Sequence, residues 1–188
     1  MNFSKQQQLF IGLVLAALMA ITRSHHFATV AHLPDISWAV FFLAGAWLVS
    51  GRAFVGLLAL AGAVDYAAIN WGGVSDFCVS AAYPFLIPAY GSLWLAGRWF
   101  AKRYSFSWRA LPLLGASLLV GAVFAELFSS GSFYFLSGRI AEPTLAGFGA
   151  SFVRYFPYSL VSLAFWMGVA ALVHTAFAYA RGAVRNHA

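Results

Sequence analysis

Residues 53–70 read AFVGLLALAGAVDYAAIN, and this stretch decides the class of the fold. Asp65 is its only charged residue. A helix that crosses a bilayer needs about 20 mainly apolar residues, and this run comes close to that length. The stretch therefore predicts a membrane-spanning helix that carries one carboxylate near its end.

The composition of the whole chain also indicates a membrane protein. Of its 188 residues, 62% are hydrophobic and 9% are charged, whereas soluble domains carry roughly a quarter charged residues. The net charge of +6 does not indicate nucleic-acid binding, because the basic residues stand at the ends of apolar runs and form no nucleic-acid motif. We therefore expect an all-α integral membrane protein.

Six apolar runs predict six transmembrane helices, which we expect to form a single domain over residues 1–188. The runs cover residues 8–22, 36–50, 53–70, 83–101, 110–128 and 144–180. The last run is too long for one simple span, so its first part should lie in an outer loop or extend the helix past the membrane. A cleaved signal peptide is the alternative for the first run, but only Lys5 precedes it, which favours a retained helix.

The distribution of Lys and Arg predicts the orientation in the membrane. If the N-terminus is inside, the inner side collects Lys5, Arg52, Arg98, Lys102, Arg103, Arg109, Arg181 and Arg185, and the outer side Arg23, Arg139 and Arg154. Because cytoplasmic loops carry an excess of basic residues, we expect both termini in the cytoplasm. The outer face then receives residues 23–35, the connection before the fourth helix, and residues 129–144. Loops on a rigid scaffold often carry function, so we expect the site there.

Cys78 lies in the second outer segment, GGVSDFCVSAAYP (residues 72–84), and is the only cysteine. A single cysteine excludes an intrachain disulfide and the usual cysteine-rich structural zinc site. It can be a buried apolar side chain, a reactive thiol, an intermolecular link or one metal ligand. A thiolate suits soft transition metals, and a metal already held in a macrocycle needs only an axial ligand from the protein.

Other polar residues near the outer face are candidates for the same site. A carboxylate at membrane depth is costly and usually faces a cavity or a partner, so Arg154 is a possible counter-ion for Asp65. Glu126 stands similarly near the end of its run. These groups either form structural ion pairs or bind a polar ligand. Of the adjacent His25 and His26, at most one should face a site, because neighbours on a helix point apart; hydrated loop histidines are the alternative.

Two further patterns in the sequence each have two interpretations. Aromatic residues crowd the outer segments, where they can form an interfacial belt or the walls of a pocket for a large flat ligand. Gly12, Ala16 and Ala20 recur at a spacing of four in the first run. Small residues at this spacing let another helix approach closely, either within the protein or from a partner protein.

The motifs TRSHHF (residues 22–27) and VSDFCVSAAYPF (residues 74–85) resemble those of the BtuM-type family of cobalamin transporters. This family is related to the S-components, the substrate-binding subunits of energy-coupling factor (ECF) transporters. The resemblance in size and topology covers essentially the whole chain. It implies an S-component-like protein of the bacterial cytoplasmic membrane, which binds cobalamin from the outer face and mediates its uptake.

The resemblance also implies roles for individual residues. Cys78 would ligate the corrin cobalt axially, with the dimethylbenzimidazole displaced to a base-off form. His26, Asp65 and Tyr83 would line the site, and Arg154 joins them as the possible counter-ion. We expect the thiolate to weaken the bond to the opposite axial group, so that Cys78 could remove cyanide from cyanocobalamin.

The small-residue strip Gly12, Ala16 and Ala20 resembles the motif by which S-components dock on the transmembrane subunit of the ECF module. Two alternatives to cobalamin uptake stay open. The protein could be an S-component for another small vitamin, with a structural Cys78, or a membrane oxidoreductase that depends on haem or a thiol.

Overall fold

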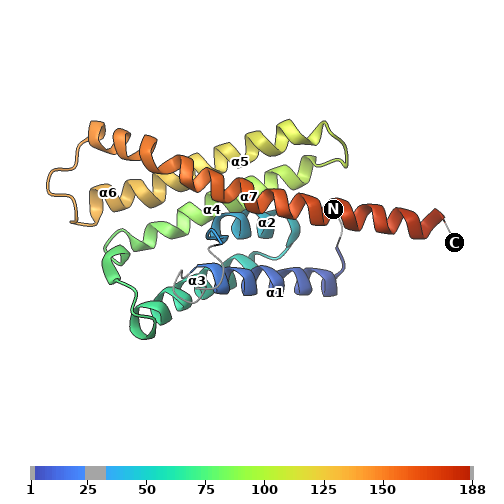
Figure 1. Ribbon diagram of the computed structural model, residues 1–188, viewed down its shortest axis with the longest axis horizontal. Coiled ribbons are helices and arrows are strands. Elements are labelled where there is room, and N and C mark those ends of the chain that lie inside the picture. The colour runs from blue at the N-terminus through green and yellow to red at the C-terminus, as the bar shows by residue number, and fades with distance from the viewer. Residues whose placement is uncertain (1–2, 24–32, 187–188) are drawn as a thin grey trace.

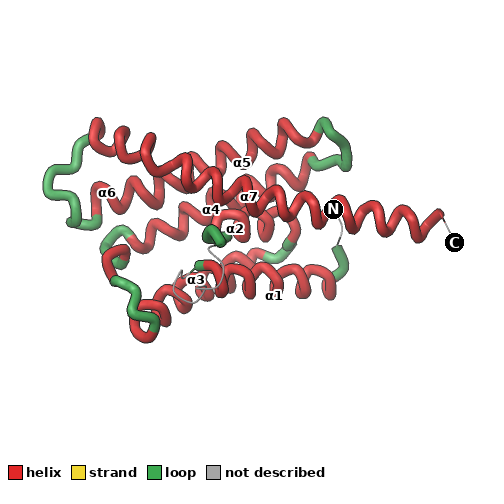
Figure 2. Tube along the Cα trace, in the orientation of Figure 1, coloured by secondary structure: helices red, strands yellow, loops and turns green. Residues whose placement is uncertain are grey.

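The computed structural model describes residues 3–23 and 33–186, with side chains up to residue 180, and every regular element among them is helical. The helices are α1 (Lys5–Thr22), α2 (Ser37–Trp47), α3 (Gly51–Trp71), α4 (Leu86–Arg103), α5 (Ala110–Glu126), α6 (Ser132–Leu136) and α7 (Leu145–Asn186). Two 3₁₀ turns, η1 (Asp76–Cys78) and η2 (Tyr83–Phe85), precede α4, and a π-helical segment, η3 (Leu127–Gly131), joins α5 to α6. From α2 onward, loops and turns connect the successive helices (Figure 2). The predicted all-α class is confirmed.

Four helical stretches are long and apolar enough to cross a membrane, so the chain is a multi-pass membrane protein. They are Lys5–Thr22, Gly51–Trp71, Ala110–Leu136 and Leu145–Ala180. The other two predicted spans differ from these four. α2 has only 11 residues, and α4 carries three basic residues, Arg98, Lys102 and Arg103, in its 18.

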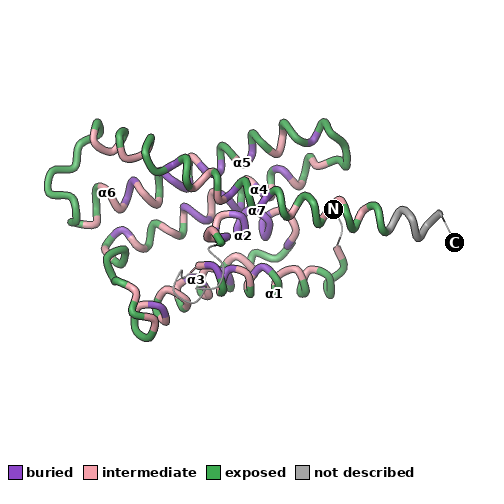
Figure 3. Tube along the Cα trace, in the orientation of Figure 1, coloured by how far each residue is buried: buried purple, intermediate pink, exposed green. Residues whose placement is uncertain are grey.

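α2 is a half-length helix in the core of the bundle. Phe41, Phe42, Val40 and Ala44 are fully buried, and the buried positions of α2 stand out in Figure 3. Eleven residues extend only about 16 Å, well short of the roughly 30 Å hydrocarbon core. A helix that is apolar all round is typical of a protein interior, so the hydrophobicity of this run reflects core packing.

α2 and α4 approach each other closely through two glycines. A Cβ atom at Gly45 would collide with the backbone carbonyl of Trp94, and one at Gly97 would collide with the carbonyl of Phe42. Each helix thus presents a glycine to the backbone of the other. Just along the same contact, the rings of Phe41 and Tyr90 stack with centroids 4.2 Å apart and an interplanar angle of 8°.

α7 is a single helix of 42 residues, about 63 Å long at 1.5 Å per residue. The first part of the last apolar run is therefore helical and does not form a loop. Pro157 lies inside this helix and removes one backbone hydrogen bond. α7 also holds the segment before α2, because Ser162 and Trp166 donate to the carbonyls of Asp35 and Pro34 at 2.6 and 2.8 Å.

The connections gather at the two ends of the bundle. Residues 72–85 and 137–144 lie at one end, whereas residues 104–109, the first turn of α1 and the last turns of α7 lie toward the other (Figure 1). Two of the three segments predicted to carry the site, residues 72–84 and 129–144, therefore share an end.

Candidate functional site

Arg23, directly after α1, forms a two-point ion pair with Asp65 of α3. Its Nε lies 2.7 Å from Oδ1 and its Nη2 lies 2.8 Å from Oδ2. The side chains are 8% and 25% exposed, respectively. Charge-assisted bonds in this paired geometry are strong and hold both groups in one orientation. The pairing explains how a carboxylate is tolerated within α3.

The ion pair is the centre of a hydrogen-bond network that joins five elements of the chain. Arg23 Nη1 donates to the hydroxyl of Tyr90 on α4 at 2.6 Å and to that of Ser37 on α2 at 3.0 Å. The hydroxyl of Tyr83 in η2 donates to Asp65 Oδ2 at 2.8 Å. The network therefore fixes the start of α4 relative to α1, α2 and α3.

The environment keeps both Arg23 and Tyr83 protonated. Burial opposes the charge of Arg23, but its interactions with Tyr90 and Asp65 outweigh this, so the pKa of Arg23 lies above its ordinary value. Burial, followed by the hydrogen bond to Asp65, raises the pKa of Tyr83 above its ordinary value. Both groups thus act as hydrogen-bond donors at neutral pH, and Asp65 accepts from both.

The network forms part of the wall of a cavity of about 870 Å³, the Cys78 cavity. This volume is at the upper end of the range for small-molecule sites. The polar part of the lining consists of Arg23, Asp35, Asp65, Ser75, Cys78, Ser129, Ser130, Ser151 and four tyrosines, Tyr83, Tyr90, Tyr134 and Tyr155. Aromatic side chains also line it, among them Trp38, Phe77 and Phe133.

Cys78 is exposed and faces this cavity. Its interpretation as a buried apolar side chain is therefore wrong. The local fold follows from the sequence before it: Gly73 adopts a φ of 68°, which favours glycine, and the Ser75 hydroxyl accepts from the Phe77 N–H at 3.2 Å to start η1. Asp65, Cys78 and Tyr83, three of the predicted site residues, thus line one cavity.

Of the other predicted residues, Arg154 does not line this cavity. The expected pairing of Arg154 with Asp65 is wrong, because Arg23 occupies that position. Arg154 is exposed, lies 5.5 Å from the ring centre of Tyr155 and is absent from the cavity lining. Tyr155 is one residue further, a rotation of about 100°, and it faces the cavity. His26, like His25, falls outside the described residues.

Glu126 is buried, with 3% exposure, at the end of α5. Its Oε1 accepts from the Ser130 hydroxyl at 2.6 Å, and the Ser159 hydroxyl of α7 lies 3.4 Å from Oε2. Within residues 3–23 and 33–180, no basic side chain comes within 4.0 Å of it, so of the two alternatives for Glu126 the structural ion pair is not formed there. Ser130 lines the Cys78 cavity while Glu126 does not.

The small-residue strip borders a contact inside the protein. Gly12, Ala16 and Ala20 are all half-buried, and Ala16 packs against the hydrophobic core. A Cβ atom at Gly12 would lie 3.7 Å from the side chain of Leu48, just after α2. The strip therefore serves internal packing at least in part, and its use as a docking surface stays a prediction.

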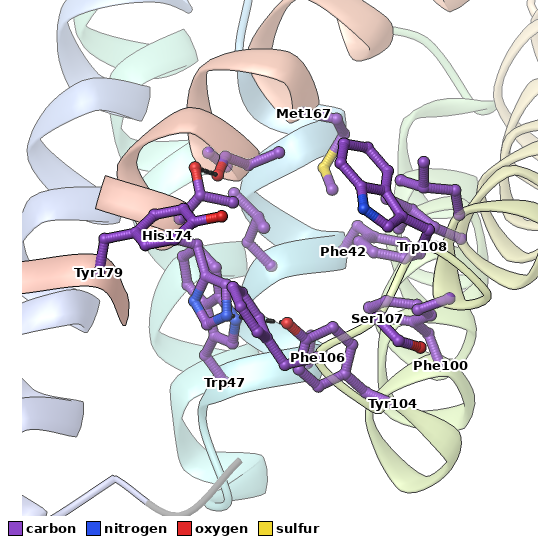
Figure 4. Close-up of a pocket in the computed structure, with 18 residues that line it drawn as sticks. Phe42, Trp47, Phe100, Tyr104, Phe106, Ser107, Trp108, Met167, His174 and Tyr179 are labelled. Carbon is purple, nitrogen blue, oxygen red and sulfur yellow. Dashed lines mark hydrogen bonds between the residues drawn. The ribbon is translucent and has the colours of Figure 1, made fainter. Parts of the chain in front are cut away.

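A second, smaller pocket lies at the other end of α4 (Figure 4). This pocket of about 440 Å³, the Tyr104 pocket, is mainly apolar and includes Phe42, Trp47 and Met167 in its lining. The Tyr104 hydroxyl lies 2.9 Å from His174 Nε2. None of the predicted site residues lines it.

Sequence reasoning missed Arg23, Ser37 and Tyr90 as members of the network. Arg23 had been assigned to an outer loop as a topology signal. Two features of the sequence could have indicated Arg23 as the partner of Asp65. Asp65 needs a counter-ion, and Arg23 stands at the end of an apolar run. No family model matches the chain, and no curated protein is significantly similar to it.

Proposed function

We propose that this protein binds cobalamin in the Cys78 cavity and mediates its uptake across the cytoplasmic membrane of a bacterium. In this proposal α2 and α4 complete a six-helix, S-component-like arrangement with both termini in the cytoplasm. The observation that carries it is the exposed thiol of Cys78 in a cavity of about 870 Å³ whose polar groups are already fixed by hydrogen bonds.

A corrinoid suits a site with one soft ligand. The described residues contain no group of three or more His, Cys, Asp or Glu side chains that could hold a bare metal ion. A metal that brings most of its own ligands suits such a set of residues. Corrin nitrogens fill four cobalt positions, and the Cys78 thiolate supplies a fifth with the dimethylbenzimidazole displaced.

The rest of the lining supports a large ligand with a cationic centre and polar edges. Asp35 and Asp65 oppose the single positive charge of Arg23, which leaves an excess of negative charge to face cobalt(III). The hydroxyl of Tyr83 and the carboxylate of Asp65 can bind amide groups at the corrin edge. Trp38 and Phe77 offer flat apolar surface. His26 stays a predicted contact.

The same ligation would favour loss of cyanide from cyanocobalamin. Cys78 gives its thiol proton to solvent and donates an electron pair to cobalt. The opposite cobalt–carbon bond breaks heterolytically, so cyanide leaves with both electrons and is protonated by water, and a water molecule can take its place. Cobalt stays in the +3 state throughout, and no oxidant or reductant is needed.

The visible spectrum of the protein purified from cells grown with cyanocobalamin tests this proposal. We expect bound pigment with a spectrum shifted from that of free cyanocobalamin, and at least about tenfold weaker binding in Cys78→Ala, which corresponds to about 1.4 kcal/mol. Cys78→Ser is the matched control, since it keeps the size but replaces the soft sulfur by oxygen, and it should also lose the shift.

Other outcomes separate the alternatives. An unshifted cyanocobalamin spectrum at full occupancy would refute ligation by Cys78. A colourless protein that binds another vitamin would support the general S-component alternative, and a haem spectrum would support the oxidoreductase. Docking of an ECF transmembrane subunit on Gly12, Ala16 and Ala20 is part of the proposal, and co-purification with that module would test it.

A further inference from the structure

The Tyr104 pocket lies where α2 and α4 end and α5 begins, against the middle of α7. Its volume of about 440 Å³ is bordered by mainly apolar side chains, and none of the described residues that line it is Asp, Glu, Lys or Arg. Figure 4 shows Phe42, Met167 and Trp108 around the interior. An occupant of this pocket must therefore have an apolar part.

A few polar atoms accompany this apolar surface. The Tyr104 hydroxyl and His174 Nε2 are 2.9 Å apart, and the Ser107 hydroxyl group belongs to a residue of the same lining. The rings of Trp47 and Phe106 lie 6.5 and 6.0 Å from that of His174. The pocket therefore offers hydrogen-bonding groups beside an aromatic wall, which suits an amphiphilic molecule.

Basic residues stand next to residues of the pocket lining in the chain, and the guanidinium of Arg103 lies over the ring of Trp99, which is not part of that lining. The stretch KRYSFSWR (residues 102–109) contains three cations and no acidic residue, and Lys102, Arg103 and Arg109 are all exposed. Tyr104, Phe106, Ser107 and Trp108, which lie between these cations in the chain, line the pocket. The occupant should therefore be anionic where it leaves the pocket.

We propose that the Tyr104 pocket binds an anionic phospholipid of the surrounding bilayer. One acyl chain lies in the apolar pocket, and the phosphate lies by Arg103 and Arg109. Basic pockets between transmembrane helices bind anionic lipid headgroups in this way. Trp108 is 87% exposed, as expected for an aromatic side chain at the membrane interface. The site does not depend on cobalamin or on the Cys78 cavity.

The test uses the full-length protein in detergent, depleted of lipid and without cobalamin. Phosphatidylglycerol and phosphatidylcholine with identical acyl chains are added in turn, and retained lipid is counted by native mass spectrometry while the unfolding temperature is recorded. We expect one tightly held phosphatidylglycerol and a rise in unfolding temperature, with at least tenfold weaker retention of phosphatidylcholine.

Two sets of variants assign the site. The double variant Arg103→Gln/Arg109→Gln should weaken phosphatidylglycerol binding at least tenfold, whereas the matched pair Arg139→Gln/Arg154→Gln, exposed arginines that are remote in sequence from the pocket, should leave it unchanged. Ala170→Trp, which fills the pocket without changing charge, should also abolish tight retention.

Three outcomes would overturn the proposal. These are equal retention of the two lipids, unchanged binding in Arg103→Gln/Arg109→Gln, and an equal loss in Arg139→Gln/Arg154→Gln. The last result would indicate that the lipid is attracted to basic surface in general and does not bind at a specific site. Because cobalamin is absent throughout, failure here says nothing about ligation by Cys78.

Discussion

The Cys78 cavity and the Tyr104 pocket lie at opposite ends of α4 and place their charges differently. The Cys78 cavity carries Arg23 and Asp65 in its wall, where the two are paired and largely buried. The Tyr104 pocket has no such group in its lining, and its nearby cations, Arg103 and Arg109, stay exposed.

The difference shows what each end can offer a ligand. A buried charge needs a fixed partner, and that requirement makes the wall of the Cys78 cavity rigid before any ligand arrives. The Tyr104 pocket offers a mainly apolar wall with several aromatic side chains, which suits a flexible acyl chain. The first end therefore suits a specific polar ligand, and the second suits an amphiphile.

The largest expected effect is the loss of the charge on Arg23. Arg23→Met leaves Asp65 without its counter-ion, so the free energy of unfolding should fall by about 3–5 kcal/mol, as measured by unfolding in detergent micelles. Arg23→Met/Asp65→Leu should recover much of this loss, because an apolar pair replaces the ion pair. If the double variant were as unstable as the single one, the loss would not come from the unpaired carboxylate.

A pair of tyrosine variants compares the two ends directly. Tyr83→Phe removes a hydrogen bond to a carboxylate and should cost about 1.5–3 kcal/mol, whereas Tyr104→Phe removes a bond to His174 and should cost about 0.5–1.5 kcal/mol. Unfolding of the two variants in the same detergent measures the difference. Equal losses, or a larger loss for Tyr104→Phe, would contradict the contrast drawn between the ends.

The smallest effect is expected at Arg154. Because its side chain is exposed and does not line the Cys78 cavity, Arg154→Gln should change the free energy of unfolding by less than about 0.5 kcal/mol. The visible spectrum of the bound pigment should also be unchanged. Loss of that spectrum in Arg154→Gln, with Cys78 intact, would indicate that Arg154 contacts the bound pigment.

Much of the fold could be predicted, because hydropathy reports how much apolar surface a helix carries. It does not report whether that surface meets lipid or protein. The run that became α2 is apolar on all sides, and only the structure shows that Phe41 and Phe42 face other helices. The close contact of Gly45 and Gly97 with opposing backbone is likewise invisible in a sequence, since it depends on how two helices cross.

The loops between helices allowed some residues of the site to be predicted. Which of these residues pair with each other was harder to predict. Cys78 and Tyr83 follow each other closely, so topology alone brings them together at one end. The predicted partner of Asp65 was Arg154, inside the last apolar run, whereas the partner in the structure is Arg23, at the end of the first run. Choosing between them requires the rotation of α7 about its axis, and this is set by packing along the whole helix.

The π-helical segment η3 has a consequence for how this protein can change during evolution. A π-helical turn holds more residues than an α-helical turn, so these five residues turn the chain about as far as four residues of an α-helix. Deleting one residue from Leu127–Gly131 would therefore give a regular α-helix and leave Phe133 and Tyr134 facing the cavity. Replacing the π-helical turn by an α-helical one without a deletion would instead turn α6 by about 100°. The loss of a single codon here is thus a change that this wall of the cavity can tolerate.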